Sequence, residues 1–597
     1  MKKRCNMFIE ECKVIFYIIK KTQRMSKSYL PLMIINAIVK TLMPILAVII
    51  PKYLIDEIMY KCRINVICLI VLSITISNFL FGQLSAYLDT IVAIKSYEIN
   101  NLFDFQISKK IMELPYEKIE DPNILNLKER AIFPIKNQGA INRVVSGTSR
   151  LFSMMLTVFS LLMIICEYNI AIISVLIIIC IINIKVSNKS CEYQYEYYKN
   201  LVPIQREFTY FSNLACDFEF GKEVRLYKMK DLILSRIRHY DDRSLNLMGQ
   251  AYKGVGKIEG WSGVINACQI GLAYIAAIIT FIFNDMTIGG FTMFINAVNK
   301  LIASIDDILK TIIDMKQMAQ YLKYYIEFDQ IRPAYDKGTL NCQNKSFEII
   351  FDNVSFKYPN SDVYVLKNVS VDIKAGEKVS IVGVNGAGKT TFVKLLLMLY
   401  KPTEGAILVN GINLEKYDFK DYIKHVSAIF QDYKLFAASI IENIAFEAEA
   451  EVEKIKTILN ELHIDLKKLP DGLYTEIFKI FDENGIEMSG GEGQKVAIAR
   501  SIYKEADLII LDEPTAALDP IAEKEVYTHF DNLTGNKTSI FISHRLSSCH
   551  LSDKILVFDN GRIVQEGSHK KLLEDKTGLY YKMFSTQAKN YKKENVR

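Results

Sequence analysis

Several features common in soluble, secreted or nucleic-acid-binding proteins are scarce in this sequence or missing from it. Only 23% of its 597 residues are charged, while 50% are hydrophobic, which is too apolar for an ordinary soluble protein and excludes a disordered chain. The 73 Lys and Arg exceed the 67 Asp and Glu only slightly, so no nucleic-acid partner is expected. The 11 cysteines are odd in number and include no Cys-x-x-Cys pair, which argues against a disulfide framework and a zinc site.

Long uncharged stretches occur only in the first half of the chain. Four of them have the length, or nearly the length, that a helix needs to cross a bilayer: residues 64–82, 151–166, 168–184 and 261–284. Two further stretches, residues 32–51 and 286–305, qualify if the membrane tolerates Lys40 and Lys300. The sequence therefore predicts six membrane-spanning helices, with the lipid bilayer as a partner.

The connections between these stretches differ in charge. Two turns carry one acid each, Glu167 and Asp285, and no Lys or Arg, so we expect them outside the cell. The N-terminus and the segments of about 91–143 and 185–258 are rich in Lys and Arg and are expected in the cytoplasm. The exceptions to this rule lie in the first outer loop: Lys52, Lys61 and Arg63. The prediction is a multi-pass protein of the cytoplasmic membrane whose N-terminus and C-terminal half are cytoplasmic.

From Phe347 onward, short β-rich runs alternate with helical stretches, which predicts an α/β domain. One predicted strand, residues 378–382, leads directly into residues 383–390, Gly-Val-Asn-Gly-Ala-Gly-Lys-Thr, and a helical stretch follows. This is the spacing of a phosphate-binding P-loop, in which glycines let backbone N–H groups face phosphate oxygens. Lys389 is expected to reach the β- and γ-phosphates of ATP, and the Thr390 hydroxyl to bind Mg²⁺.

A second predicted strand, residues 508–511, ends in two acids, Asp512 and Glu513. Ligands of α/β proteins lie at the carboxyl edge of the sheet, so we expect both carboxylates beside the nucleotide. Asp512 would hold Mg²⁺ through water, and Glu513 would act as the general base that polarises the attacking water.

Further motifs accompany these two in a fixed order. They are Tyr358 in Phe-Lys-Tyr-Pro, the P-loop, Gln431 in Phe-Gln-Asp, Ser489-Gly490-Gly491 at a predicted helix start, Asp512-Glu513, Asp519 in Ala-Leu-Asp and His544 in Ile-Ser-His-Arg. The order resembles the ABC-type ATPases throughout residues 347–580. Six spans fused ahead of one such domain are similar to the bacterial half-transporter exporters of the ABC superfamily, and residues 116–131 and 222–232 resemble their coupling-helix regions.

This resemblance implies a role for each motif residue. Tyr358 would stack on adenine, Gln431 would sense Mg²⁺ and contact the membrane domain, and His544 would touch the γ-phosphate. Ser489 and Gly491 would complete the ATP site of the opposite subunit. The remaining nucleotide contacts are expected from Gly383, Asn385, Gly386, Gly388, Lys389, Thr390, Thr391, Gly490 and Asp519. The signature departs from the commonest family form at Met488 and Glu492, but both flank a backbone-built cradle, so the site is expected to work.

The signature helix also predicts a dimer. Its N-terminus should face phosphate, yet the P-loop already occupies that position in its own chain. Together with this observation, the family resemblance implies that two chains sandwich two ATP molecules head to tail. A homodimer is favoured, and pairing with a degenerate partner stays open. Closure of the ATP-bound dimer, followed by ATP hydrolysis, would move the helix bundles so that the membrane cavity opens alternately to the inside and to the outside.

The chain is thus expected to comprise an all-α transmembrane domain followed by an α/β ATPase domain. The predicted parts are an N-terminal amphipathic elbow (1–27), a transmembrane domain with six helices and two cytoplasmic coupling regions (28–320), a linker (321–346), a nucleotide-binding domain (347–585) and a basic tail (586–597).

The substrate is expected to be an amphipathic drug, lipid or peptide that leaves the cytoplasm. Four polar residues of the sixth span recur at helical spacing and form one stripe: Asn296, Lys300, Ser304 and Asp307. This stripe either faces a water-filled cavity or already lies in the cytosol. Lys40 in the first span either contacts substrate or extends toward the membrane surface.

Three other functions were weighed against export. An importer on the same scaffold is disfavoured by the membrane-then-ATPase order and by the lack of a solute-capture domain. A membrane-tethered ATPase with a regulatory or immunity role would hydrolyse ATP at a rate that no lipid, drug or peptide alters. A transporter that also cleaves leader peptides is disfavoured because only a short basic segment precedes the first span at Leu32.

Overall fold

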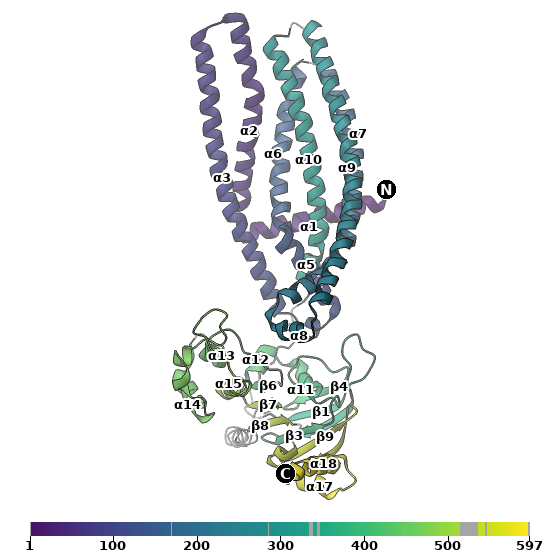
Figure 1. Ribbon diagram of the computed structural model, residues 1–597, viewed down its shortest axis with the longest axis vertical. Helices are drawn as coiled ribbons and strands as arrows, with labels where there is room; N and C mark the ends of the chain where they lie inside the picture. The colour runs from purple at the N-terminus through teal and green to yellow at the C-terminus, as the bar shows by residue number, and fades with distance from the viewer. Residues whose placement is uncertain are drawn as a thin grey trace. The chain divides into compact units, whose positions relative to one another are not determined.

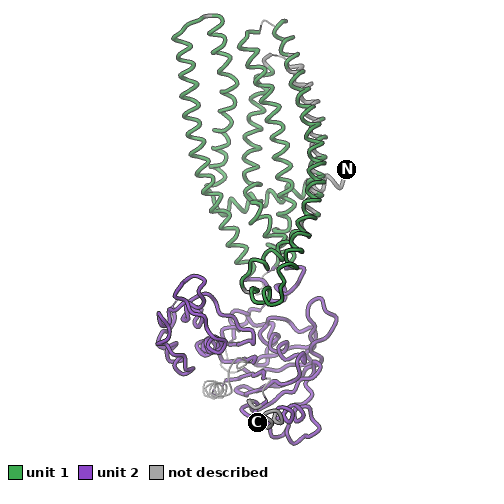
Figure 2. Tube along the Cα trace, in the orientation of Figure 1, with its two compact units in different colours: residues 1–111, 126–331 green, residues 112–125, 332–597 purple. Residues whose placement is uncertain are grey.

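The computed structural model describes residues 2–168, 170–283, 286–332, 338–342, 347–447, 449–513, 535, 537–543 and 546–594. The chain divides into two compact units, shown in Figure 2. Unit 1 comprises residues 1–111 and 126–331, and unit 2 comprises residues 112–125 and 332–597. A short segment from the first half of the chain therefore belongs to the same unit as the C-terminal half.

Unit 1 is built from long helices (Figure 1). They are α1 (Lys2–Met25), α2 (Tyr29–Asp56), α3 (Ile64–Met112), α5 (Pro122–Gln138), α6 (Ala140–Tyr168), α7 (Ile170–Cys216), α8 (Gly221–Leu226), α9 (Lys230–Phe283) and α10 (Ile288–Asp329), with a π-helical turn η1 (Glu57–Lys61) and a 3-10 turn η2 (Phe218–Phe220). Among the described residues, five helices are long and apolar enough to cross a membrane, namely α2, extended by η1, and α3, α6, α9 and α10. The predicted fourth span falls in α7, where most side chains of residues 168–184 lie outside the described set.

Helix α10 is the centre of the packing in unit 1. It contacts α6 and α2 along much of its length, while α7 pairs with α9. The buried face of α10 includes Phe294, Val298 and Leu301, which meet Leu161 and Ile165 of α6. These residues recur at intervals of three and four, the spacing that places side chains on one helix face.

The first residues of α10 are joined to the end of α2. Asp56 accepts hydrogen bonds from the backbone N–H of Gly289 and from Oγ1 of Thr287, both at 3.0 Å. A Cβ on Gly289 would lie 2.4 Å from the carbonyl oxygen of Lys52. The close approach of the two helices therefore requires glycine at this position.

Helix α10 continues beyond the predicted end of the transmembrane domain. Residues 321–329, expected in the linker, are helical because Leu322, Tyr325 and Phe328 continue its buried face. Helix α1 is fastened to this end of α10, since Lys21 Nζ lies 2.8 Å from Asp329 Oδ2. The charged residues that suggested a linker therefore form ion pairs along a packed helix.

Unit 2 contains two β-sheets. A four-stranded antiparallel sheet has the order β2-β1-β4-β5, with β1 (Ile349–Phe356), β2 (Leu366–Ile373), β4 (Glu404–Val409) and β5 (Ile412–Asn413). A six-stranded sheet has the order β10-β9-β3-β8-β7-β6, with β3 (Lys378–Gly383), β6 (Val426–Ile429), β7 (Leu508–Asp512), β8 (Thr538–Ile542), β9 (Lys554–Asp559) and β10 (Arg562–Gly567). All pairs in it are parallel except β9 with β10. Strands β3 and β7 therefore end at the same edge.

Short helices cover the sheets of unit 2 (Figure 1). Those described are α4 (Tyr116–Ile119), α11 (Lys389–Leu396), α12 (Phe419–Lys424), α13 (Ile440–Ala445), α14 (Val452–Glu461), α15 (Gly490–Tyr503), α17 (His569–Glu574) and α18 (Leu579–Glu594). Phe392 of α11 stacks on Phe351 of β1 with ring centroids 4.0 Å apart. A second core, among α13, α14 and α15, forms around Ile440, Ile455 and Ile498. The two cores hold α11 and α15, the helices that carry the nucleotide motifs.

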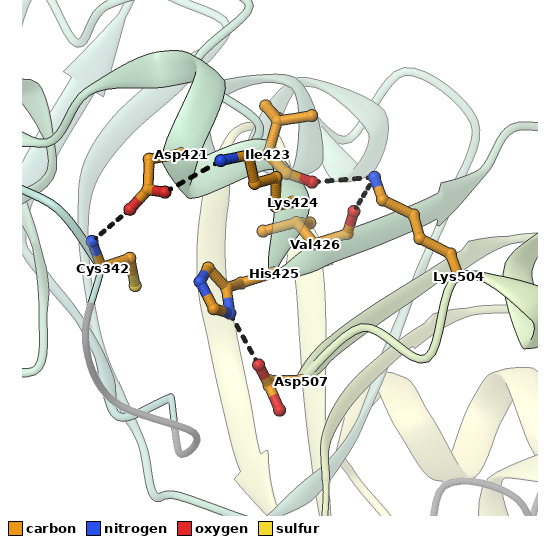
Figure 3. A network of polar contacts seen from close by, with 8 residues as sticks. All are labelled: Cys342, Asp421, Ile423, Lys424, His425, Val426, Lys504 and Asp507. Atoms are coloured by element: carbon orange, nitrogen blue, oxygen red, sulfur yellow. Dashed lines mark hydrogen bonds and ion pairs between the residues drawn. The ribbon is translucent and has the colours of Figure 1, made fainter. Parts of the chain in front are cut away.

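Residues 338–342 are attached to the surface of unit 2 near α12. The Asp418 N–H donates to the carbonyl oxygen of Leu340 at 2.9 Å. The Cys342 N–H donates to Asp421 Oδ2 at 2.7 Å, as Figure 3 shows. The last described part of the predicted linker is therefore held against the ATPase unit by backbone hydrogen bonds.

Candidate nucleotide site

The P-loop joins β3 to α11, and its shape depends on glycine. A Cβ on Gly383 would lie 2.2 Å from the carbonyl oxygen of Phe558, and a Cβ on Gly388 would lie 2.7 Å from Leu366 Cδ2. Gly386 and Gly388 have φ of +78° and +105°, which side chains rarely adopt. The backbone can therefore curl tightly before α11, as a phosphate cradle requires.

Lys389 lies inside this loop. Its side chain is 6% exposed, and its ammonium donates to the carbonyl oxygens of Gly383 at 2.9 Å and Val384 at 3.1 Å. Burial lowers the pKa of Lys389, and the nearby Glu513 and Asp512 oppose that shift. The ammonium thus lies within the curve of the loop, where it can bind phosphate oxygens.

The two acids follow β7 at the carboxyl edge of the sheet. Asp512 is 4% exposed, and burial raises its pKa to about 6, although a hydrogen bond with Thr390 acts in the opposite direction. Glu513 leaves the strand with φ of +51°, and its N–H donates to the carbonyl oxygen of Ile542 at 3.0 Å. Such backbone conformations are frequent at functional sites.

Thr390 and Asp512 together supply hydroxyl and carboxylate oxygens. These are ligands that Mg²⁺ prefers, and Mg²⁺ is commonly held by one or two protein ligands together with phosphates. Within the described part of the chain, no group of three or more His, Cys, Asp and Glu could form a metal cluster. The residues present therefore fit a magnesium ion that depends on a bound nucleotide.

Tyr358 follows β1 and is close to the P-loop helix. Its hydroxyl lies 2.9 Å from Thr391 Oγ1, and its ring packs edge-on against Phe356 and Tyr400 at centroid distances of 5.1 and 5.3 Å. The ring also lines a groove of about 640 Å³. Tyr358 therefore lies beside the P-loop helix, and its contact with adenine stays a prediction.

The segment 112–125 packs onto unit 2 beside Tyr358. Tyr116 of α4 meets Tyr400 edge-on at 5.7 Å, and Lys394 of α11 lies 3.4 Å from Glu120 Oε1. The Lys394 ammonium is also within 5.8 Å of the centroids of the Tyr116, Tyr358 and Tyr400 rings. This cluster connects the chain between α3 and α5 to the nucleotide motifs.

Glu120 is the acidic centre of this cluster. Tyr400 donates a hydrogen bond to Glu120 Oε2. Burial alone would raise the pKa of Glu120, but the hydrogen bonds from Tyr400 and Tyr116 and the charge of Lys394 outweigh it and hold the pKa below its ordinary value. Glu120 is therefore ionised at neutral pH and binds its partners as a carboxylate.

The signature Ser489 begins α15. Its side chain accepts a hydrogen bond from the Glu492 N–H at 3.3 Å and donates to Glu492 Oε2 at 2.8 Å, forming a capping box. Gly490 accepts from the Tyr433 hydroxyl at 2.9 Å. Among the described residues, no hydrogen bond joins Ser489, Gly490 or Gly491 to the P-loop of the same chain. Glu492, a departure from the common family form, therefore stabilises the helix start.

The opposite end of α15 is anchored by Lys504. Its ammonium donates to the carbonyl oxygens of Ile423 at 2.8 Å and Val426 at 2.7 Å, at the end of α12 and the start of β6 (Figure 3). Beside it, His425 Nδ1 lies 2.8 Å from Asp507 Oδ2. The signature helix is thus fixed to the strand that leads to Gln431.

The structure brings some predicted site residues together and separates others. Lys389, Thr390, Asp512 and Glu513 converge at the carboxyl edge of the sheet, and Thr391 and Tyr358 adjoin them. Gln431 is exposed just after β6, and the neighbouring Asp432 influences the pKa of Asp512. Asp519 and His544 lie outside the described residues.

Sequence reasoning missed Glu120, Lys394 and Tyr400. Glu120 lies within the predicted coupling region 116–131 but had no predicted role, Lys394 and Tyr400 belong to no predicted motif, and Glu120 and Lys394 lie 274 positions apart. A cation and an acid that distant carry no signal of their contact until the fold is known.

Comparison with known proteins agrees with this geometry. Residues 366–516 match the model of the ABC transporter family. The chain is 29% identical over 576 residues to the subtilin transport ATP-binding protein SpaT of Bacillus subtilis, which covers 93% of this chain and 91% of that protein. It also matches a structure described as a bacterial Atm1-family ABC exporter with ATP bound, with a TM-score of 0.81, 20% identity and coverage of 94% and 99% of the two chains.

Two other kinds of relative match over shorter lengths. The nisin transport ATP-binding protein NisT of Lactococcus lactis subsp. lactis is 33% identical over 60% of this chain and 58% of its own length. The ATP-dependent lipid A-core flippase of Cupriavidus metallidurans is 35% identical over 50% of each chain. The matched part therefore spans only about half the length of these relatives, in contrast to the subtilin protein.

Proposed function

Because the chain belongs to the ABC transporter superfamily and has the fold of an ABC exporter, we propose that it exports an amphipathic peptide across the cytoplasmic membrane as a dimer. It is a multi-pass membrane protein and a transport ATPase. The substrate class, the membrane, the orientation and the partner subunit are the proposed parts.

The observation that carries the proposal is the position of residues 112–125. This segment joins α3 to α5, yet it belongs to unit 2 and packs beside Tyr358 through Tyr116 and Glu120. A change in the nucleotide site can therefore reach two helices of the membrane unit through covalent connections. Such an arrangement suits an ATPase that does work on membrane helices.

Within the nucleotide site, each converging residue has a proposed role. The P-loop N–H groups and Lys389 bind the phosphates, Tyr358 contacts adenine, and Thr390, Asp512 and Gln431 hold Mg²⁺, which would neutralise phosphate charge. Glu513 accepts a proton from the attacking water. Asp519 and His544 are proposed to contribute as the family motif implies.

The dimer is proposed from the separation of α15 and the P-loop. Ser489 and Gly491 form a second phosphate-binding surface that has no hydrogen bond to the P-loop of the same described chain. A second copy, arranged head to tail, would bring each signature to the other P-loop. The motifs of this chain support a homodimer.

A peptide is favoured over a lipid by the extent of similarity. The match to the subtilin transport protein covers almost all of both chains, whereas the matches to the lipid A-core flippases cover about half. A lipid substrate is the second candidate, on the basis of those flippases. An importer or a regulatory ATPase has no comparable support.

The test uses the full chain in lipid nanodiscs. Amphipathic peptides, anionic phospholipids and dyes are screened for stimulation of ATP hydrolysis, and hits are tested for ATP-dependent movement into proteoliposomes. We expect peptides to stimulate and to be transported. Lys389→Ala should lose ATP affinity, Glu513→Gln should bind ATP without hydrolysing it, and Lys374→Ala should behave as the wild type. Hydrolysis that no peptide alters, or stimulation by lipid alone, would contradict the peptide assignment.

A further inference from the structure

We propose that Asn36 and Asp89 form a binding site, near one boundary of the membrane, for a cationic group of the transported substrate, and that the ammonium of Lys40 occupies this site when substrate is absent. The inference rests on the proposed export function and names a substrate feature that it leaves open. An ammonium or guanidinium group of a peptide is the ligand class.

The site lies between α2 and α3. Asp89 Oδ1 accepts hydrogen bonds from Lys40 Nζ at 2.7 Å and from Asn36 Nδ2 at 2.8 Å. Lys40 lies 16 residues before the end of α2 (40 to 56), about 24 Å along the helix axis at 1.5 Å per residue. Asp89 lies 25 residues after the start of α3 (64 to 89), about 38 Å along that helix. Since a bilayer core is about 30 Å thick, the pair lies near the membrane boundary opposite the loop that joins α2 to α3.

Lys40 belongs to the predicted first span, residues 32–51, and charged side chains within spans are rare and usually serve a function. The side chains of Lys40 and Asp89 are 46% and 48% exposed in a single chain. Half-exposed charges are unfavourable against lipid tails, so this pair should face water or a second subunit. A water-filled path through the membrane is where an exporter meets its substrate.

Asn36 supplies the second observation. It is 7% exposed, and the bond from Nδ2 to Asp89 fixes which end of its amide faces that carboxylate. The opposite atom, Oδ1, is buried and has no hydrogen-bond partner. Buried polar atoms are nearly always paired, so this oxygen indicates that the site is short of one donor.

Asn36 is held firmly, whereas the side chain of Lys40 is not. Helix α2 is joined to α6 one residue after Lys40, where Thr41 Oγ1 lies 2.9 Å from Ser153 Oγ, and one turn before Asn36, where Ser149 Oγ donates to the carbonyl oxygen of Met33 at 3.0 Å. Lys40 has a flexible four-carbon side chain that can extend toward the membrane surface. A substrate cation can therefore replace it at Asp89 while Asn36 stays in place.

The arrangement selects a cation rather than an anion. A phosphodiester of a lipid headgroup would be attracted to Lys40 but repelled by Asp89, and it has no proton to give to Asn36 Oδ1 at neutral pH. An ammonium or guanidinium carries several donors and can bond both oxygens. The structure thus favours a peptide with Lys, Arg or a free N-terminus over an anionic lipid.

The experiment measures binding and ATPase stimulation by two fluorescent peptides in nanodiscs. One is a synthetic amphipathic helix with four lysines, and the other replaces each lysine with glutamine. For the lysine peptide, Asp89→Asn should weaken binding at least tenfold. Lys40→Gln should strengthen it several-fold, because it removes the competing ammonium. The glutamine peptide should respond to neither change.

Opposite effects of the two variants separate this proposal from a merely structural ion pair. A structural pair, or a contact with a second subunit, predicts that Asp89→Asn and Lys40→Gln act alike and lower the thermal stability of the dimer together. The matched control is Asp314→Asn. It breaks the ion pair between Arg143 of α6 and Asp314 of α10, whose charged atoms lie 3.2 Å apart, and it should leave the binding of both peptides unchanged.

The remaining outcomes are also decisive. Equal binding of both peptides to the wild type, or binding of neither, overturns the cation site. Equal stimulation of hydrolysis by both peptides overturns the site but keeps peptide export. Binding of the lysine peptide with the predicted variant pattern, without any stimulation of hydrolysis, supports the site and contradicts the export function.

Discussion

At the scale of single residues, burial decides what an ionisable side chain can do. Lys389 is buried within the P-loop, and Asp512 is buried beside it. Each charge would be unfavourable alone, and each stabilises the other: Asp512 favours the charged form of Lys389, and Lys389 favours the charged form of Asp512. Cys549 shows burial without such partners, because burial raises its pKa to about 12 although hydrogen bonds with Ser380 and Tyr580 act in the opposite direction.

This burial predicts a labelling pattern. Iodoacetamide reacts with thiolates, and at pH 8 a thiol of pKa about 12 is ionised to roughly one part in 10⁴. At pH 8 the exposed Cys216 should be alkylated, whereas Cys549 should stay unlabelled until denaturant is added. Mass spectrometry of tryptic peptides gives both rates. Comparable labelling of the two cysteines in the native protein would contradict the burial of Cys549.

At the scale of elements, helix ends carry the function. Helix α15 begins with a capping box formed by Ser489 and Glu492. Its other end is held by the hydrogen bonds of Lys504, and burial lowers the pKa of that lysine. Both ends are therefore fixed, and the proposed phosphate-binding start of the helix has a defined direction. The short helix α4 is also fixed in position, but by other contacts: the packing of Tyr116 against Tyr400 and the ion pair of Glu120 with Lys394.

The contact of α4 predicts an uncoupling variant. Glu120→Gln keeps the shape of the side chain but removes the charge that Tyr400 and Lys394 bind, which should weaken the docking by about 1 kcal/mol because the pair is partly exposed. We expect basal ATP hydrolysis within about twofold of the wild type and a several-fold smaller response to transported peptide.

A matched control lies in the same helix. Glu117→Gln makes the same change one turn earlier, at a residue that does not bond Tyr400 or Lys394, and should leave the peptide response intact. Measuring hydrolysis in nanodiscs against peptide concentration compares the two variants. Equal responses in both would show that Glu120 does not transmit the nucleotide state.

At the scale of the whole molecule, the division of the chain between the two units does not follow the order of the sequence. Unit 2 takes residues 112–125 from within the first half, so the ATPase unit is tied to unit 1 at the ends of α3, α5 and α10. These three covalent connections are where the proposed ATP-driven movement would reach unit 1. In the proposed dimer a second copy would complete each ATP site, because one chain holds one P-loop and one signature.

The head-to-tail dimer predicts a specific crosslink. Asn385 and Ser489 are exposed and belong to the two halves of the proposed sandwich. In a Glu513→Gln background, Asn385→Cys and Ser489→Cys together should form an intersubunit disulfide when ATP is present. Each single cysteine variant is the control and should stay monomeric on a non-reducing gel. A disulfide within one chain, or one that ignores ATP, would contradict the arrangement.

Much of the fold and of the nucleotide site could be predicted from short segments. The P-loop, the buried strands before it and before Asp512, and the apolar spans each depend on neighbouring residues, so their chemistry is visible in the order of amino acids. Strands β4, β6, β9 and β10 were not predicted individually. Their short runs alternate or mix with polar residues, and such runs fit several structures until their neighbours are known.

The features that could be read from the amino-acid order are therefore local motifs. They are a glycine-rich loop followed by a helix, two acids after a buried strand, and uncharged stretches long enough to cross a membrane. Only the tertiary structure decided which distant residues meet. It paired Asp89 with Lys40 and Asn36, joined Glu120 to Lys394 and Tyr400, and extended α10 to Asp329. The physical reason is that a hydrogen bond or ion pair between distant residues depends on the path of the whole chain, which no short segment specifies.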